Sequence, residues 1–398
     1  MHVALVTDVD LSNHHLWLLS NQGRSQAAFY ILRGLLRLGV EVSVVGPIDN
    51  LLGERRLLRT YLGLKSRFYE RVRRKAYARQ AEPELVELSS NRITERLSTS
   101  DHDVVLVLGN ALPIGPTGFG GGRPIAYCHD APMVGLLDFY PHPAFANPCR
   151  ESRENFLAFE QAALRRCELV MYSCEWSAQK AIEGYGLDPA KVEVVPWGAN
   201  LDATPSDEDV ERMVCARPAD PFRLLFFGVE WQREGGDIAV AIAHEMNRRG
   251  LETELTVLGC TPPIDGPLPA FIKPLGYADK FTAAGRAMME ATLAQSHFLI
   301  LPARAEVAAH MLAEANAFGV PCLAPDVGGI ATVVVDGING GLMPRGAGPA
   351  LYADFIVRTM ANPAAYRALA RSSARRFKER LSWEVAVRDI KALLERIV

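Results

Sequence analysis

The sequence has little of what marks several common classes of protein. Its seven cysteines are scattered without a C-x-x-C pair, which argues against a zinc site and a disulfide framework. A net charge of −3 gives no general attraction to nucleic acid. The longest apolar runs, such as DVVLVLGNAL, are far shorter than a membrane span, and the first residues lack the pattern of a signal peptide. These absences predict a cytoplasmic globular protein with no bound metal.

What the chain does have is length and a regular alternation of short apolar runs with helical patterns. Its 398 residues are too many for one ordinary core and favour two domains. Runs such as HVALVT and DVVLVLG are apolar on both faces, as is typical of parallel strands covered by helices. We therefore predict an α/β fold in which two doubly wound, Rossmann-like domains face one cleft.

The expected domain boundaries follow from one interruption of this alternation. Residues 204–221 are rich in proline and charge and contain no apolar run, so they are predicted to be the interdomain linker. The first domain then covers 1–203 and the second covers 222–380. A final helix, 381–398, is expected to pack back on the first domain.

Two glutamates stand out in the stretch EVAAHMLAEANAFGVP. Glu306 follows the strand-like run HFLILPARA, and Glu314 lies eight positions later in a helix predicted over about 308–318. Eight helical residues rise roughly 12 Å, and the first N–H groups of such a helix form an anion site. A carboxylate, a set of amides and a second carboxylate match the order of sugar, diphosphate and ribose in a nucleotide-sugar. On spacing alone, two ordinary solvated glutamates remain the alternative.

The stretch from Leu301 to Pro344 resembles the retaining glycosyltransferases of family 4, which have the two-domain GT-B fold. Their hallmark is a glutamate, seven residues and a second glutamate, then G-x-P and a D-x-G-G turn, which this sequence matches with Glu306, Glu314, 319–321 and 326–329. The resemblance implies a retaining hexosyltransferase of polysaccharide biosynthesis. Its donor would be a UDP- or GDP-linked sugar, its acceptor a glycan, a lipid-linked molecule or a small molecule, and it would need no cofactor.

The resemblance also implies roles on the donor side. Glu314 would hold the ribose hydroxyls and Glu306 the transferred sugar. His310 and Met311, at the helix start, would lie beside the diphosphate. Gly23, in SNQGRSQ, stands where the family has a glycine whose backbone approaches the donor phosphate.

In the first domain the resemblance points to YCHDAP. His129 follows a strand, where the family often carries a histidine facing the sugar, although a purely structural histidine remains an alternative. Asp130 would either orient His129 or contact the acceptor, and the sequence does not choose between these roles.

The sequence departs from the family in the loop GVEWQREGG, where the family has an arginine or lysine pair that neutralises the diphosphate. Val229 and Glu234 occupy those positions. A carboxylate repels a diphosphate, so Glu234 must turn away or the donor must bind differently. Arg233 is the nearest replacement, because a guanidinium can grip phosphate oxygens bidentately, although a surface charge is the alternative. Lys280 and Arg304 are weaker candidates.

A second departure is Ala309, which stands where the family usually has glycine and narrows the backbone's approach to phosphate. Together with Glu234, it keeps two other functions open. One is a non-catalytic GT-B-like protein that binds a nucleotide or acts as a scaffold. The other is a sugar-nucleotide epimerase.

Residues 54–79 are strongly basic, with ten Lys and Arg against two glutamates. Apolar residues recur among them at helical spacing. A basic amphipathic helix can make peripheral contact with an anionic membrane or border an acidic acceptor. A solvated helix that covers the first domain is the alternative.

Overall fold

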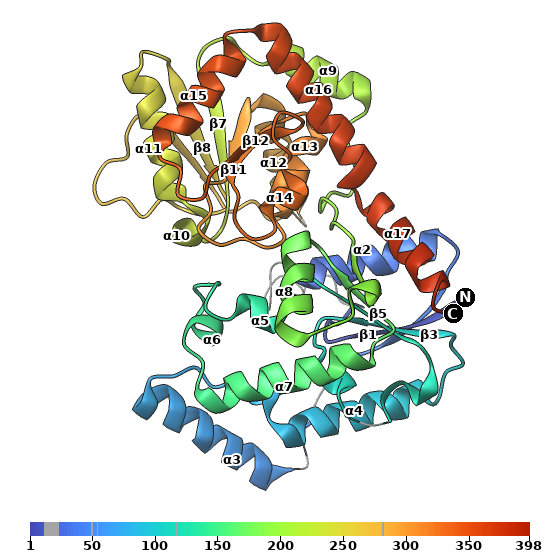
Figure 1. Cartoon of the computed structure of the whole chain (residues 1–398). Coiled ribbons are helices and arrows are strands. Elements are labelled where there is room, and N and C mark those ends of the chain that lie inside the picture. The colour runs from blue at the N-terminus through green and yellow to red at the C-terminus, as the bar shows by residue number, and fades with distance from the viewer. Residues whose placement is uncertain (12–23, 49–50, 54, 117, 281) are drawn as a thin grey trace. The chain divides into compact units, whose positions relative to one another are not determined.

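Each half of the chain forms its own parallel sheet with helices on both faces (Figure 1). The computed structural model describes residues 1–11, 24–48, 51–53, 55–116, 118–280 and 282–398. The chain divides into two compact units, the first made of Met1–Val195 with Ala386–Val398 and the second of Pro196–Val385. These two parallel sheets confirm the predicted class of two doubly wound α/β units.

The first unit contains a six-stranded sheet in the order β2-β1-β3-β4-β5-β6. All its pairings are parallel, and β1 lies between β2 and β3, with Val3 opposite both Val42 and Val104. The strand order changes direction at β1, which is the switch point of a doubly wound sheet. The strands are β1 (His2–Thr7), β2 (Glu41–Val45), β3 (Val104–Leu108), β4 (Ile125–His129), β5 (Leu169–Tyr172) and β6 (Val192–Val194).

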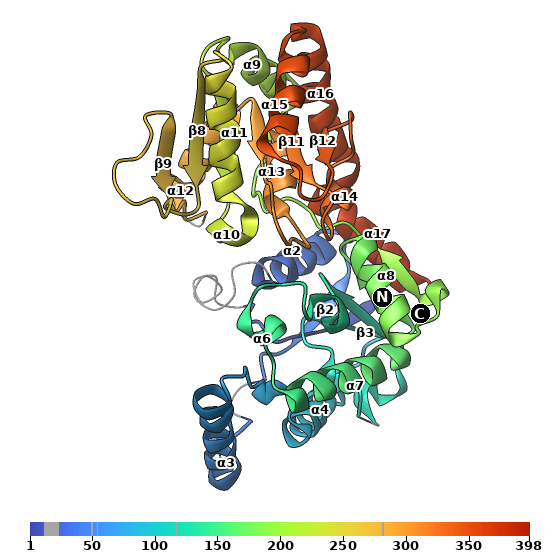
Figure 2. The same cartoon turned by 60° about the vertical axis from the view of Figure 1, so that its left-hand side comes forward.

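Helices cover both faces of this sheet. Ile93, Ala163 and Ala181 bring α4, α7 and α8 into one core with the inner side chains of the strands. Figures 1 and 2 place α2 on the side opposite α4. The helices are α2 (Arg24–Arg37), α3 (Arg56–Arg67) with a π-helical continuation (Phe68–Arg73), α4 (Pro83–Leu97), α5 (Met133–Leu136), α6 (Pro143–Ala146), α7 (Arg150–Arg166) and α8 (Glu175–Tyr185), with short 3₁₀ turns at Arg79–Ala81, Leu112–Ile114, Phe119–Gly122 and Pro189–Lys191.

The second unit repeats the arrangement with the strand order β12-β11-β10-β7-β8-β9. Its strands are β7 (Phe222–Phe227), β8 (Thr253–Leu258), β9 (Ile272–Gly276), β10 (Phe298–Ile300), β11 (Cys322–Pro325) and β12 (Gly340–Met343). Its helices are α9 (Asp207–Ala216), α10 (Trp231–Glu234), α11 (Gly236–Arg248), α12 (Ala283–Gln295), α13 (His310–Ala317), α14 (Ile330–Val333), α15 (Pro349–Met360) and α16 (Pro363–Arg380). Trp231, Ile242 and Ile356 share one core with β7, β8 and β10.

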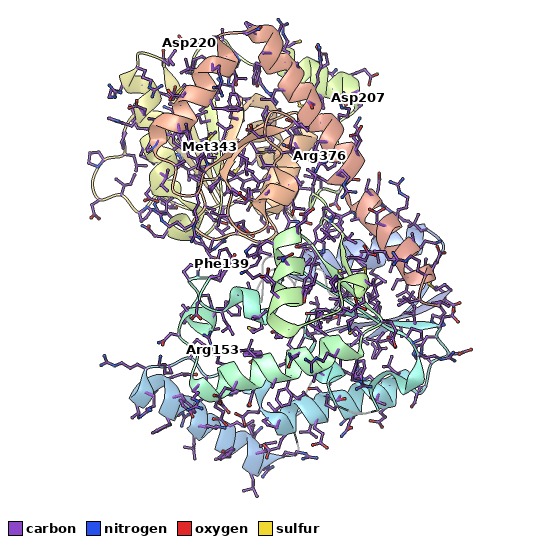
Figure 3. The ribbon with its side chains drawn as sticks, in the orientation of Figure 1. Phe139, Arg153, Asp207, Asp220, Met343 and Arg376 are labelled. Carbon is purple, nitrogen blue, oxygen red and sulfur yellow. The ribbon has the colours of Figure 1, made fainter. Side chains whose placement is uncertain are left out.

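The stretch expected to be a linker, 204–221, is instead part of the second unit. Ser206 and Asp209 form a reciprocal capping box that starts α9. Val210 and Val214, one turn apart, are buried in the core of that unit. Asp207, labelled in Figure 3, accepts a 2.7 Å hydrogen bond from Lys378 of α16. The chain therefore passes between the units at Val195 and Pro196, earlier than predicted.

The last helix, α17 (Trp383–Glu395), begins in the second unit and continues in the first, to which Ala386–Val398 belong. It packs closely on α2. A Cβ atom placed on Gly34 would lie 2.7 Å from Cγ2 of Val387, which is buried. Only glycine therefore allows the two helices to approach this closely.

This contact gives a prediction about stability. Gly34→Ala should lower the free energy of unfolding by about 1–3 kcal/mol, because the new methyl group overpacks the contact with Val387. Gly63→Ala, in α3, is the matched control, since no atom lies within 4 Å of its Cβ position. That control should raise stability by about 0.5–1 kcal/mol. Urea titration of both variants measures the difference, and equal effects would show that the α2–α17 contact is loose.

Candidate functional site

Glu306 lies in the loop that leaves the carboxyl end of β10, and its carboxylate is buried. Oε1 accepts a hydrogen bond from the Val307 N–H at 2.9 Å, and the Glu306 carbonyl accepts one from Gly329 at 3.1 Å. The second bond ties the loop to the D-x-G-G turn, 326–329. Gly235 brings the α10 loop against this strand end, because its φ is +81° and a Cβ there would lie 2.1 Å from the Pro302 carbonyl oxygen.

A cluster of three carboxylates surrounds the buried guanidinium of Arg233. Nη1 donates to Glu306 Oε2 at 2.7 Å and also to the Ala305 carbonyl at 2.9 Å, while Nη2 donates to Glu234 Oε1 at 2.9 Å. Nε lies 3.0 Å from Glu230 Oε2. Arg233 is thus not a plain surface charge. It is the cation that holds the Glu306 carboxylate in place.

Glu234, which replaces the expected cation, is only 1% exposed. Its Oε1 accepts from Arg233, and its Oε2 accepts from the Glu230 N–H at 2.7 Å. Burial raises the pKa of Glu234 to about 7, with Arg233 acting in the opposite direction and the Glu306 charge adding to the rise. Glu234 therefore changes its charge near neutral pH.

Glu314 is fully buried in the second turn of α13 and pairs with Lys280. Lys280 Nζ lies 2.5 Å from Oε1 and 5.2 Å from the centre of the Phe227 ring. The other oxygen, Oε2, is buried and has no hydrogen-bond partner among the described residues. Since an unpaired buried carboxylate oxygen is costly, this atom is suited to accept a hydrogen bond from a ligand.

Helix α13 begins two residues later than predicted, at His310. The N–H of His310 donates to the Ala308 carbonyl at 2.9 Å, so it is already used. The imidazole Nδ1 donates to the Gly198 carbonyl at 2.9 Å, and the ring stacks on Trp197 with centroids 5.8 Å apart. Burial lowers the pKa of His310 below its usual value, which favours a neutral ring at the helix start. Met311, the next residue, is half-buried.

Arg304 pairs with Asp237 and with neither of the two buried glutamates. Its two terminal nitrogens form a bidentate pair with the Asp237 carboxylate at 2.9 and 2.7 Å, and Nη1 also donates to the Gln232 carbonyl at 2.6 Å. Its side chain is exposed, and none of these three bonds involves Glu306 or Glu314. The structure thus pairs Arg233 with Glu306 and Lys280 with Glu314, but it pairs Arg304 with Asp237.

In the first unit, His129 and Asp130 form a pair at the end of β4. His129 is buried, and its Nδ1 lies 2.7 Å from Asp130 Oδ1 and 3.0 Å from the Ala131 carbonyl. The Ala131 N–H also approaches Nδ1, at 3.3 Å, but it donates to Asp130 Oδ1 at the shorter distance of 2.8 Å. The two nearer oxygens therefore favour a proton on Nδ1. Its ring stacks on Tyr127. Asp130 is therefore placed where it can orient the His129 ring.

The segment after Asp130 is fixed by α7. Glu160 accepts hydrogen bonds from the Met133 N–H at 2.7 Å and from the Tyr185 hydroxyl. Arg153 donates to Asp138 at 2.7 Å, and Figure 3 labels this arginine. These bonds hold the loop that follows the His129–Asp130 pair.

One predicted residue cannot be placed, and two residues without a predicted role lie beside the candidate site. Gly23 lies outside the described residues. Trp383 had no predicted role. Its Nε1 donates to Asn200 at 2.9 Å, and its ring lies against His310. Glu230 was also missed, since its role depends on the fold of α10. In the part of the chain that the structure describes, no group of three His, Cys, Asp or Glu side chains is placed to hold a metal ion.

Comparisons with protein families match both units. The family described as Glycosyltransferase Family 4 matches residues 23–203, and the family described as Glycosyl transferases group 1 matches residues 221–362. The E-x7-E motif, with Arg233 and Lys280, falls inside the second match. The His129–Asp130 pair falls inside the first.

The curated relatives share 30% or less of their aligned residues with this chain. A D-inositol 3-phosphate glycosyltransferase of Geodermatophilus obscurus is 30% identical over 256 residues, covering 61% of this chain and 55% of the relative. One of Catenulispora acidiphila is 28% identical over 243 residues, covering 58% of each chain. The chain thus spans little more than half the length of these relatives.

Solved structures share the fold over nearly the whole chain. A sucrose-phosphate synthase from Thermosynechococcus elongatus superimposes with a TM-score of 0.65 at 16% identity, covering 100% of this chain and 98% of its own. HepE from Anabaena, in complex with UDP-glucose, gives a TM-score of 0.61 at 16% identity, covering 99% of each chain. At such identities the likeness establishes the fold, which is GT-B.

The raised pKa of Glu234 predicts a pH-dependent stability. The folded protein holds this proton more tightly than the unfolded chain, so the free energy of unfolding should fall as pH rises from about 4.5 to about 7. The full effect is on the order of 3 kcal/mol. Glu234→Gln should lose this slope, whereas Glu290→Gln, at an exposed site on α12, should keep it. Denaturant titrations across that pH range provide the test, and parallel curves for all three proteins would contradict it.

Proposed function

Because this chain belongs to the group 1 glycosyltransferases of family 4, we propose that it moves a sugar from a nucleoside-diphosphate donor to an acceptor. One observation carries the donor side of the proposal. Glu314 is completely buried, yet its Oε2 has no partner among the described residues. A ribose hydroxyl would supply the missing hydrogen bond, and Lys280 would keep the carboxylate ionised and oriented.

The diphosphate would lie at the start of α13, whose N-terminus carries partial positive charge. His310 is held there by Gly198 and Trp197, and Met311 follows it. Arg233 would share its guanidinium between Glu306 and a phosphate oxygen when donor binds. Gly23, outside the described residues, is kept as a proposed phosphate contact on the family resemblance alone. The three carboxylates around Arg233 already use much of its charge, and the His310 N–H already donates to Ala308. The remaining N–H groups at the start of α13 and its dipole would therefore have to carry a large share of the neutralisation.

Glu306 would position the transferred sugar by accepting hydrogen bonds from its hydroxyls. The bond from Arg233 fixes one oxygen of the carboxylate, and the Val307 N–H fixes the other. As the bond to the diphosphate lengthens, positive charge develops on the sugar, and an ionised carboxylate beside the ring would stabilise it. Retention of configuration is part of the proposal through the family resemblance.

His129 would serve the sugar or acceptor from the first unit. Because the proton on Nδ1 faces Asp130, the Nε2 atom would be the one that meets a hydroxyl of the sugar or acceptor. We propose a UDP- or GDP-linked donor and a glycan, lipid-linked or small-molecule acceptor, in polysaccharide biosynthesis on the cytoplasmic side. HepE was solved with UDP-glucose, and the curated relatives are named for D-inositol 3-phosphate. Peripheral contact with a membrane through 54–79 belongs to the same proposal.

A non-catalytic nucleotide-binding protein is the second candidate. It is favoured by Arg233, which is surrounded by Glu230, Glu234 and Glu306 rather than left for a diphosphate. A sugar-nucleotide epimerase would use the same donor site but would convert donor without acceptor.

Removing the Glu314 carboxylate should weaken nucleotide binding. Glu314→Ala should reduce the affinity for UDP or GDP by about 10- to 100-fold, because the ribose loses its acceptor. Isothermal titration calorimetry measures this, with Glu290→Ala as an exposed control on a neighbouring helix. An unchanged affinity in a variant that still melts cooperatively would remove Glu314 from the site.

Substitution of Glu306 should affect turnover of the donor but not binding of the nucleotide. Glu306→Gln should keep nucleotide affinity within about twofold, while release of nucleoside diphosphate from the preferred donor falls by about 100-fold or more. The assay first tests UDP- and GDP-sugars with the natural sequence and follows both donor hydrolysis and epimerisation. If no donor is turned over although nucleotide binds, the non-catalytic alternative is correct. If Glu306→Gln loses binding and turnover equally, Glu306 contacts the nucleotide.

A further inference from the structure

Helix α3 and its π-helical continuation expose a row of large apolar side chains. Leu57 is 90% exposed, Tyr61 54%, Leu64 60%, Phe68 50% and Val72 68%. The spacing of four, three, four and four residues places them on one side of a helix. We call this set, Leu57, Tyr61, Leu64, Phe68 and Val72, the outer stripe. A contiguous exposed apolar surface of this kind marks an interaction site more often than isolated exposed residues do.

The opposite side of the helix is fixed to the first unit, so the outer stripe cannot turn inward. Leu62 and Ser66 are buried. Lys65 donates to Glu82 at 2.8 Å and to Glu151 at 2.6 Å. Tyr69 stacks on Tyr77 with ring centroids 5.5 Å apart. Figure 2 shows α3 standing out from α4 and α7 at the edge of this unit.

Basic residues accompany the outer stripe. Over 55–75, the exposed charged side chains are one acidic residue, Glu70, and eight basic ones, Arg55, Arg56, Arg59, Arg67, Arg71, Arg73, Arg74 and Lys75. At helical spacing, Arg56, Arg67 and Arg71 lie along one edge of the stripe. The protein as a whole has a net charge of −3, so this positive charge is local. An apolar row with a basic edge is the pattern of a helix that lies in a membrane interface.

The positive charge beside the outer stripe helps to distinguish between three possible binding partners: a second copy of the chain, a nucleic acid and a lipid surface. Two copies of the chain meeting through their outer stripes would bring two sets of eight exposed cations together, and such like-charge contact is unfavourable. A nucleic acid would satisfy the arginines but would leave five large apolar side chains in water. An anionic lipid surface offers phosphate groups to the arginines and an acyl boundary to the apolar row at the same time.

We propose that the outer stripe and its basic edge dock the protein on a membrane surface that contains anionic lipid, with the five apolar side chains inserted at the level of the lipid headgroups. The inference gives the proposed membrane contact of 54–79 its residues and its lipid class, and it does not depend on turnover of a donor. In the part of the chain that the structure describes, no helix is long and apolar enough to cross a membrane.

Co-sedimentation with vesicles tests the proposal. The full chain should bind vesicles made of equal parts phosphatidylcholine and phosphatidylglycerol at least about tenfold more strongly than vesicles of phosphatidylcholine alone. Added salt should weaken this binding, because it screens the arginines. The double variant Leu64→Gln and Phe68→Gln should lose most of it. A triple variant, Arg56→Gln with Arg67→Gln and Arg71→Gln, should lose roughly fivefold per arginine.

Matched controls use exposed residues outside this surface. Leu351→Gln with Met288→Gln removes two exposed apolar side chains from α15 and α12. Arg367→Gln, Arg375→Gln and Arg380→Gln together remove three exposed charges from α16. Both controls should bind the anionic vesicles as the natural sequence does. Calorimetry with UDP and GDP should show the same nucleotide affinity for every variant. A loss of vesicle binding can then be assigned to α3 and not to damage at the donor site.

Three outcomes would overturn the proposal. Equal binding to both kinds of vesicle would remove the role of the basic edge. Equal losses in the outer-stripe variants and in the matched controls would remove the role of α3. A dimer that is detected by sedimentation velocity and dissociates in the Leu64→Gln, Phe68→Gln variant, without vesicle binding, would assign the stripe to a second copy of the chain. Intact nucleotide binding in any of these cases would leave the proposed transferase function untouched.

Discussion

The candidate site of the second unit depends on two buried carboxylates, Glu306 and Glu314, each of which is paired with a cation. An ionised carboxylate withdrawn from water is strongly unfavourable unless a charge partner and hydrogen bonds replace the lost solvation. Arg233 does this for Glu306, and Lys280 does it for Glu314. The short α10 helix, the positive φ of Gly235 and the turn that ends at Gly329 all bring backbone or charge to the loop that carries Glu306. Such a cluster is better suited to holding a polar ligand than to adding stability.

The same cluster accounts for the unusual residue at position 234. A lysine there would face the Arg233 guanidinium in a buried position, whereas a glutamate accepts one of its hydrogen bonds. The cost is a carboxyl group whose pKa is raised by burial to about 7. Protonation of Glu234 removes one of three negative charges around Arg233. Donor affinity at this site is therefore expected to depend on pH near neutrality.

The sequence predicted the parts of the fold and site that rest on local pattern. Apolar runs located most of the strands, but not β9 (IKPLG) or β12 (GGLM), which are not continuous apolar runs. The match to the family's E-x7-E pattern, and not the spacing alone, singled out Glu306 and Glu314. Residues 204–221 are rich in proline and charge, as a linker is, but the capping box at Ser206 and the apolar pair Val210 and Val214 form a helix of the second unit there. The pairing of Arg233 with three carboxylates was not predictable, since those bonds depend on how α10 packs against the end of β10. The hydrogen bond from His310 to the Gly198 carbonyl joins residues 112 positions apart, so local sequence pattern could not predict it either.

A crystal structure of the protein with a bound nucleoside diphosphate, UDP or GDP, tests the central claim most directly. We predict a ribose hydroxyl at hydrogen-bond distance, roughly 2.6–3.0 Å, from Glu314 Oε2, with the diphosphate against the first residues of α13. A nucleotide bound away from α13, or a ribose with Glu314 Oε2 still unpartnered, would contradict the assignment of this buried carboxylate to the donor.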